Sequence, residues 1–166
     1  MKRVVIVVAL VALALGAVPL FAADANAYQA LSKHYEAMRQ ALLHDGTKGV
    51  SEHALAFEKI SDQLQAGFSA EKAGIRADQK ADLMKILPDL SKAASDMAAT
   101  KDLDAAREAF VAFSVPMVKY RNLVGDSSSA VVYCSMKKKT WVQPKGEIGN
   151  PYLGQKMATC GQIVSN

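Results

Sequence analysis

The stretch that decides the fold runs from Asp102 to Gly125 and reads DLDAAREAFVAFSVPMVKYRNLVG. Its apolar residues recur every three or four positions, which is the spacing of one buried face of an α-helix. Asp102 is suited to cap the N-terminus of this helix and Gly125 to end it. Pro116 lies inside and should bend the helix. The apolar face consists of Leu103, Ala106, Phe110, Phe113, Met117, Tyr120 and Val124.

Three stretches upstream show the same period. Their apolar faces are Tyr28, Leu31, Tyr35, Met38 and Leu42; Val50, Ala54, Phe57, Ile60, Leu64 and Phe68; and Leu83, Leu87, Leu90, Ala94 and Met97. Ser51 or Thr47 should cap the second helix, and Pro88 should kink or restart the third. Each amphipathic helix needs partners to cover its apolar face. We therefore predict an all-α fold in which residues 28–125 form an antiparallel four-helix bundle.

The character of the chain changes after Gly125. Ser127–Ser129 is typical of a short linker, and no helical period follows it. Val131–Tyr133 and Trp141–Gln143 have the composition of short strands, with turn-forming proline and glycine residues after the second. We expect residues 126–166 to form a mostly irregular tail with short strands. About 40 residues bury too little surface to be stable alone, so the tail must pack on the bundle, be cross-linked or be organised by a ligand. We expect it to dock on the bundle.

The first residues are typical of a secretory signal peptide. Lys2 and Arg3 precede an apolar run from Val4 to Leu15, and small residues between Ala23 and Ala27 suit cleavage by signal peptidase. The apolar run is shorter than the roughly 20 residues that a membrane span needs. We therefore predict that residues 1–27 are a signal peptide with a cleavage site between Ala23 and Ala27. The protein is then periplasmic, without stable membrane insertion after cleavage.

Charge gives little reason to expect a nucleic-acid partner. The formal net charge is +4, and Lys2 and Arg3 of the predicted signal supply half of it. From Ser127 onward the chain has five lysines and one glutamate. Such a lysine-rich tail is more typical of a solvated surface than of a site for an anionic partner.

Both cysteines of the chain lie in the tail, and each has a methionine close by. Cys134 is followed by Met136, and Cys160 is preceded by Met157. Two thiolates and two thioethers form a soft ligand set that selects Cu(I) and similar ions. An exported protein, however, ordinarily pairs an even number of cysteines in disulfides, and methionines often serve only in packing. The residues leave both a metal site and a Cys134–Cys160 disulfide open.

The tail also resembles a known family. The residues that carry this resemblance are Val132–Met136, which reads VYCSM, then Trp141, and Glu147–Gly161, which reads EIGNPYLGQKMATCG. They are similar to an uncharacterised family of small periplasmic domains that occur alone or attached to the adaptor (membrane fusion) subunits of copper and silver efflux pumps. The family pattern is Cys-Pro-Met, a Trp, and Asn-Pro-Tyr-x-Gly-x-x-Met-x-x-Cys-Gly. Ser135 stands where the family has proline, and this replacement loosens the local turn.

The helical part is similar to the same family. Tyr35–Leu43 with Asp45 resembles its first helix, and Asp104–Phe110 with Phe113-Ser114 resembles its last. The resemblance implies a heavy-metal role, with Cu(I) or Ag(I) as the bound ion and an efflux adaptor as partner. The ligands that it implies are Cys134, Met136, Met157 and Cys160.

Two other features are candidates for metal chemistry. His44 and His53 flank the first interhelical turn, where with Asp45 they would make a secondary Cu(II) or Zn(II) site. Trp141 is the only tryptophan and is expected either to pack the tail onto the bundle or to make a cation–π contact with a soft ion.

Other classes of function lack a supporting motif. The chain has no Cys-x-x-Cys-His for covalent haem, no recognised setting for a nucleophilic Ser or Cys, and no phosphate-binding glycine loop. We therefore expect a binding protein without enzymatic activity. The alternative is a structural or interaction module of an envelope complex, with the tail closed by a disulfide and no metal.

Overall fold

The computed structural model describes residues 26–166, which are mostly helical. Four long helices are α1 (Ala27–Leu43), α2 (Val50–Ala66), α4 (Lys80–Ala98) and α5 (Leu103–Val124). The short helix α3 (Ala70–Ala73) and the 3₁₀ turn η1 (Ala77–Gln79) connect α2 to α4. The C-terminal part contains the strands β1 (Ser129–Cys134), β2 (Lys139–Pro144) and β3 (Gln162–Ser165), with the 3₁₀ turn η2 (Gly154–Met157) before β3.

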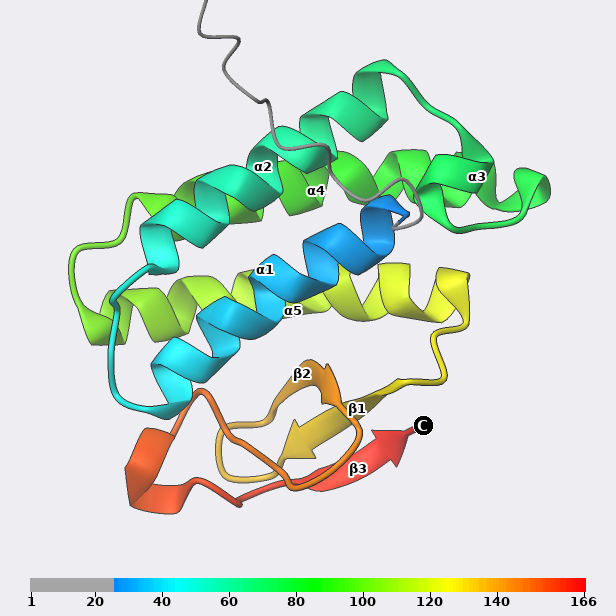
Figure 1. Cartoon of the computed structure of the whole chain (residues 1–166). Helices are drawn as coiled ribbons and strands as arrows, with labels where there is room; N and C mark the ends of the chain where they lie inside the picture. Colours follow the sequence, from blue (N-terminus) through cyan, green and yellow to red (C-terminus); the bar gives the residue numbers. More distant parts are fainter. Residues whose placement is uncertain (1–25) are drawn as a thin grey trace, which may run out of the picture.

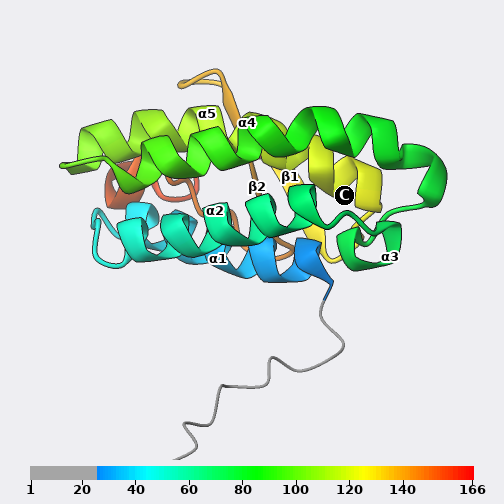
Figure 2. The same cartoon turned by 90° about the horizontal axis from the view of Figure 1, so that it is seen from above.

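The four long helices lie side by side (Figures 1 and 2). α1 packs on α2 and α5, and α4 packs on the same two helices. Most residues of the predicted apolar faces are buried in the core that these helices share, and Ile60, Phe68, Leu103 and Val124 are partly buried at its margin. The prediction of four long amphipathic helices is confirmed, and their arrangement fits a helical bundle.

Helix α5 begins and ends where the sequence predicts. The Asp102 carboxylate accepts a hydrogen bond from the Ala105 N–H at 2.8 Å, and Gly125 ends the helix with a φ of +69°. Both internal prolines lie within continuous helices, Pro88 in α4 and Pro116 in α5. Of the two outcomes expected at Pro88, a restart of the helix is therefore wrong, and residues on both sides of the proline are buried in the same core. A kink at Pro88 stays a prediction.

The start of α2 differs from the prediction. Its N-cap is Gly49, which has a φ of +79° and provides no side-chain hydrogen bond. Neither Ser51 nor Thr47 is the cap. The Ser51 hydroxyl instead donates to the carbonyl of Ala98 at 3.0 Å and so fastens the start of α2 to the end of α4.

The tail is more regular than the sequence predicts. The two expected strands form an antiparallel hairpin in which Val132 lies opposite Trp141. A third strand, β3, pairs antiparallel with the other edge of β1 and gives the strand order β2-β1-β3. The sequence did not predict β3, because its four residues are exposed and their position is set by pairing with β1.

The sheet lies against the side of the helices formed by α1 and α5 (Figure 1). Three hydroxyl groups join the layers. The Tyr35 hydroxyl of α1 lies 2.7 Å from the Ser114 hydroxyl of α5. The Tyr152 hydroxyl donates to the carbonyl of Thr140 in the sheet at 2.6 Å, and its oxygen lies 3.1 Å from the Ser114 hydroxyl. These buried hydrogen bonds fix the tail on the helices.

Most of the predicted signal peptide, residues 1–27, lies outside the described residues. Its last two residues already belong to the fold, because the Asn26 side chain accepts a hydrogen bond from the Gln29 N–H and caps α1, which starts at Ala27. Within the described part of the chain, no helix has the length and apolar character needed to cross a membrane.

We expect Asp102→Ala to lower the free energy of unfolding by about 1 kcal/mol, because it removes the N-cap of α5. Asp89→Ala is the matched control, since Asp89 is exposed in the interior of α4 and caps no helix. Urea denaturation followed by circular dichroism measures both. Equal stability of the two variants would contradict the role of Asp102.

Candidate metal centre

The two cysteines meet at the end of the sheet farthest from the start of β1. Cys134 is the last residue of β1, and Cys160 lies between η2 and β3. Their Sγ atoms are 3.5 Å apart and both thiols are free. Cys134 is fully buried, whereas Cys160 is half-buried. The structure thus brings together two thiols that are 26 positions apart in the sequence.

This separation is compatible with both states that the sequence left open. Two sulfurs bound at about 2.3 Å to one tetrahedral ion lie about 3.8 Å apart, whereas the sulfurs of a disulfide lie about 2.05 Å apart. The observed 3.5 Å is close to the first value and needs a modest inward movement to reach the second.

The two methionines lie on the surface near the cysteines. Met136 is in the turn between β1 and β2 with 61% of its side chain exposed, and Met157 is the last residue of η2 with 38% exposed. The Cys160 N–H donates to the Met157 carbonyl at 3.1 Å, so these two residues belong to one tight turn. Solvent exposure therefore increases from the buried Cys134, through Cys160, to the thioethers of Met136 and Met157.

The two thiols differ in acidity. Burial raises the pKa of Cys134, but the backbone N–H of Lys137, the Cys160 thiol, the Asn150 side chain and the N–H of Met136 outweigh it, and the net pKa is lowered. The hydrogen bond to Cys134, together with burial and the charge of Cys134, raises the pKa of Cys160. The backbone N–H groups of Lys137 and Met136 thus favour the ionised form of Cys134.

Asn150 organises the loop that carries Cys160. Its side-chain amide donates to the Cys160 carbonyl at 2.6 Å, and its side-chain oxygen accepts from the N–H groups of Tyr152 at 2.8 Å and Leu153 at 3.1 Å. Its own N–H donates to the carbonyl of Ala158 at 2.7 Å. Asn150 is fully buried, so one side chain holds both ends of the loop together.

Trp141 lies beside Gly161, the residue that follows Cys160. It is fully buried, its indole N–H donates to the Gln143 side chain at 2.9 Å, and its ring stacks edge-on against Tyr152. A Cβ atom on Gly161 would lie 2.9 Å from the edge of the Trp141 ring, so the residue after Cys160 must be small. This position makes the single tryptophan a local probe of the cysteine pair.

A buried arginine fastens the start of the loop to α1. Arg39 is 4% exposed, forms an ion pair with Glu36 at 2.6 Å, and donates to the carbonyl of Gly149 at 2.5 Å. A Cβ atom on Gly149 would come within 2.5 Å of the Arg39 guanidinium and 2.8 Å of Leu43. Glycine is therefore required at position 149 by close approach.

A second arginine fastens the middle of the loop. Arg107 of α5 donates to the carbonyl of Pro151 at 3.1 Å and pairs with Asp45 at 2.5 Å. The hydrogen bond from Arg107, the largest influence, lowers the pKa of Asp45, which also accepts from the N–H of Gln155. Gly154 has a φ of +56°, and a Cβ atom there would collide with Asp45 and Arg107.

Sequence reasoning did not assign roles to Arg39, Arg107 and Asn150. Both arginines lie in the helical stretches on which the family resemblance rests, and Asn150 lies in the tail pattern. Two features of the sequence together would have indicated them. One is a polar residue on an otherwise apolar helix face, and the other is a glycine-rich loop whose backbone carbonyl groups need hydrogen-bond donors.

The histidines are placed differently from the expected pairing. His53 of α2 has its Nδ1 atom 3.1 Å from the Nδ1 of His34 in α1. His44 is exposed at the C-cap of α1 and has its Nδ1 3.4 Å from the Gln155 amide of the tail. The structure thus brings His53 to His34 and not to His44. The neighbour of His44 is Gln155. Burial, followed by the charge of His53, lowers the pKa of His34.

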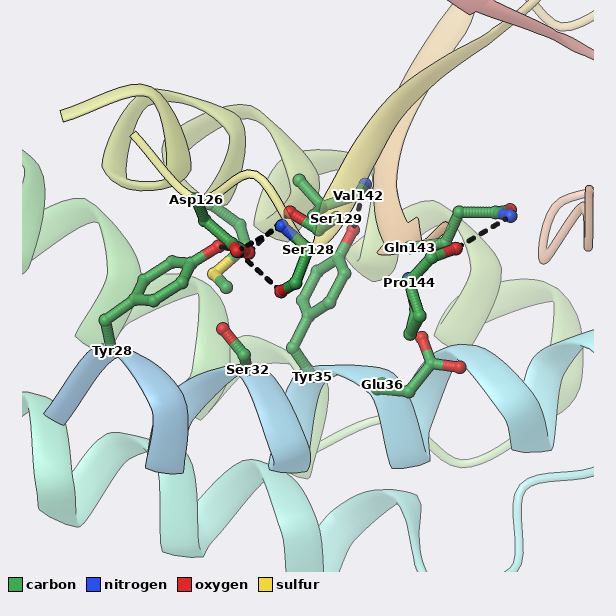
Figure 3. Close-up of a pocket in the computed structure, with 11 residues that line it drawn as sticks. Tyr28, Ser32, Tyr35, Glu36, Asp126, Ser128, Ser129, Val142, Gln143 and Pro144 are labelled. Atoms are coloured by element: carbon green, nitrogen blue, oxygen red, sulfur yellow. Dashed lines mark hydrogen bonds between the residues drawn. The ribbon is translucent and has the colours of Figure 1, made fainter. Parts of the chain in front are cut away.

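A small pocket of about 100 Å³ lies at the opposite end of the sheet, between α1, the start of β1 and β2 (Figure 3). On one side Asp126 accepts hydrogen bonds from the hydroxyl groups of Tyr28, Ser128 and Ser129. Burial raises the pKa of Asp126, but the serine groups and Tyr28 outweigh it and lower this pKa to about 2. The serine segment is therefore fastened to α1.

Within the described residues, no three His, Cys, Asp or Glu side chains gather into a metal-binding group. An ion at the cysteine pair would accordingly take its further ligands from the methionines or from solvent.

Comparison with known protein families identifies the helical part of the chain. A family described as "Protein of unknown function (DUF3347)" matches residues 31–129. This match covers more than half of the chain and fits the resemblance to an uncharacterised family, and it ends at the first residue of β1, before the cysteines. No curated protein and no solved structure matches the chain.

We expect Gly154→Ala to lower the free energy of unfolding by about 3 kcal/mol. The alanine must adopt a positive φ, and its methyl group must displace the Asp45–Arg107 pair. Gly125→Ala is the matched control, since its φ of +69° is similar but open space surrounds its Cβ position. The control should lose about 1 kcal/mol. Thermal denaturation measures both, and equal losses would show that the loop is not clamped at this point.

Proposed function

The chain belongs to the DUF3347 family of proteins of unknown function, and we propose that it is a periplasmic protein that binds a soft monovalent ion, Cu(I) or Ag(I). The proposed ligands are Cys134 and Cys160, with Met136 and Met157 completing the site. The bound ion would be handed to an efflux adaptor protein. In this proposal residues 1–27 are removed on export, and the chain binds the ion without catalysing a reaction.

One observation carries the proposal. Two free thiols from distant parts of the tail have their Sγ atoms 3.5 Å apart, and each is followed or preceded within three residues by an exposed methionine. Thiolate and thioether sulfurs favour Cu(I) and Ag(I) over harder cations such as Mg(II) and Ca(II). The donor set therefore fits a soft ion better than any other class of metal.

The acidity of the thiols supports ion uptake. A cysteine binds metal as the thiolate, so a bound proton must leave. The N–H groups of Lys137 and Met136 help to hold the Cys134 pKa below its ordinary value, which lowers the free energy needed to release that proton. Thioethers bind without losing a proton, which suits Met136 and Met157 to the first contact with an incoming ion.

The gradient of burial supports transfer rather than permanent storage. Met136 and Met157 are exposed, Cys160 is half-buried and Cys134 is fully buried. In the proposed path an ion first meets the exposed thioethers and then moves to the thiols. An adaptor that docks over the exposed methionines would reach the same ion, which is the basis for proposing such a partner.

The helices would serve as the rigid support of this site. We propose that residues 28–125 form an antiparallel four-helix bundle whose function is to hold the tail. Arg39 and Arg107 bind backbone carbonyls of the loop that leads to Cys160. Most of the tail's order then comes from the helices, and metal binding need not fold it.

A disulfide-linked structural module is the second candidate, because the same two thiols lie close enough to be joined after a small inward movement. Periplasmic thiols are exposed to an oxidising environment, and closing the loop between Cys134 and Cys160 would stabilise the tail by about 3 to 4 kcal/mol. In this form the tail binds no metal and the protein acts as an interaction module of an envelope complex.

We expect the reduced mature chain to bind one Cu(I) or Ag(I) ion, with quenching of Trp141 fluorescence because the indole ring lies beside Gly161, the residue after Cys160. The Cys134→Ala/Cys160→Ala double variant should lose affinity by more than about 100-fold, since both thiolate ligands are gone. Titration against a competing Cu(I) chelator measures the affinities.

Methionine variants test whether Met136 and Met157 bind the ion or only contribute to packing. The Met136→Leu/Met157→Leu variant should bind about tenfold more weakly, whereas Met84→Leu, a half-buried control in α4, should bind like the wild type. Undiminished binding by the double cysteine variant would refute the site. Undiminished binding by the methionine variant would restrict it to the thiols.

We expect protein prepared from the periplasm without reductant to contain free thiols or bound metal if the soft-ion function operates. Intact-protein mass spectrometry and metal analysis of the same sample distinguish the states. A mass that is lower by two hydrogen atoms in metal-free protein would favour the Cys134–Cys160 disulfide and the structural module. Cys134→Ala, which cannot form this bond, is the mass control.

A further inference from the structure

Two histidines face one another across the contact between α1 and α2, away from the sulfur residues. The Nδ1 atoms of His34 and His53 are 3.1 Å apart. Their ring centroids are 5.4 Å apart with an interplanar angle of 50°, and both side chains are half-buried. Nothing in the proposed soft-ion function uses this pair.

We propose that His34 and His53 form a second metal site, for a divalent ion of intermediate softness such as Cu(II) or Zn(II), which links α1 to α2. Neutral imidazole is a ligand that these ions prefer. The site is independent of the cysteines and of the soft monovalent ion proposed for them.

The separation of the two nitrogens fits ligands of one ion. Two nitrogens that each lie 2.0–2.1 Å from one ion, at an angle of roughly 100° between the bonds, are about 3.1 Å apart. The observed 3.1 Å has this value without any movement of the helices. Each ring must turn so that its Nδ1 lone pair points at the ion instead of at the other ring.

Ion binding would move the hydrogen that the two rings share, and both rings would stay neutral. In the neutral pair, one Nδ1 carries the hydrogen and donates it to the lone pair of the other Nδ1. When the ion binds, the donor ring keeps its hydrogen on Nε2 instead, and both Nδ1 lone pairs become ligands. Within the described residues no third His, Cys, Asp or Glu joins this pair in a metal-binding group, so water completes the coordination.

The bound ion would crosslink α1 and α2, which are consecutive helices that also pack on one another. Because the site requires both helices in their native packing, the ion binds the folded chain and raises its thermal stability. The order of affinities should follow the general preference of imidazole sites, with Cu(II) bound more tightly than Zn(II) and Mg(II) not bound.

The test uses the full mature chain with Cys134→Ala/Cys160→Ala, which removes thiols that bind Zn(II) and reduce Cu(II). Saturating Zn(II) should raise the melting temperature by at least about 3 °C, and an equal concentration of Cu(II) should raise it further. Adding His34→Ala or His53→Ala should abolish both shifts. His44→Ala is the matched control, because His44 is the remaining histidine and is exposed beside the tail.

Three results would overturn the proposal: no shift with either ion, a shift that survives both His34→Ala and His53→Ala, or a shift that His44→Ala abolishes. Far-UV circular dichroism establishes that each variant folds. If the cysteine-free background is unfolded, the oxidised wild type replaces it. Electron paramagnetic resonance of the Cu(II) form provides a second measurement, in which nitrogen coupling should be present in the parent and absent from the His34→Ala/His53→Ala double variant.

Discussion

Fastening of the Gly149–Gln155 loop to the helices is the constraint on which the rest of the tail depends. The buried Arg39 guanidinium, neutralised by Glu36, donates to the carbonyl of Gly149, and Arg107 donates to the carbonyl of Pro151. A charge this deeply buried is tolerated because it is both paired and hydrogen-bonded. Once the loop is fixed, Asn150 sets the path of the chain to Cys160 and so determines that the two thiols meet.

The helical part was predictable because its information is local. A period of three to four residues in Leu103–Val124 is enough to define a helix and the face that it buries, and Asp102 and Gly125 mark its ends. The short helix α3 and strand β3 were not predictable in this way. Strand β3 is four exposed residues long, and its conformation comes from pairing with β1 instead of from its own composition.

The candidate site was predictable in its residues and less so in its geometry. The Cys-x-Met and Met-x-x-Cys spacings identify four sulfur residues. The 3.5 Å between the thiols, however, results from the pairing of β1 with β3, in which Tyr133 lies opposite Gln162, a contact between segments distant in sequence. The histidines show the same limit. His44 and His53 are close in sequence, yet His44 sits at the C-cap of α1 and turns towards Gln155, whereas packing of α1 on α2 brings His34 to His53.

The departure from the family pattern at position 135 can be evaluated from the thiol's hydrogen bonds. The backbone groups that lower the pKa of Cys134 are the N–H groups of Lys137 and Met136. The N–H group of Ser135 is not one of these donors. Proline has no N–H group, so serine and proline at position 135 leave the thiol with the same donors. What proline would contribute is a fixed backbone angle before a turn in which Lys138 has a φ of +55°. In this chain that turn is held between two paired strands, because Cys134 lies opposite Lys139 at the end of the hairpin. The donors to Cys134 therefore depend on strand pairing more than on the residue at position 135.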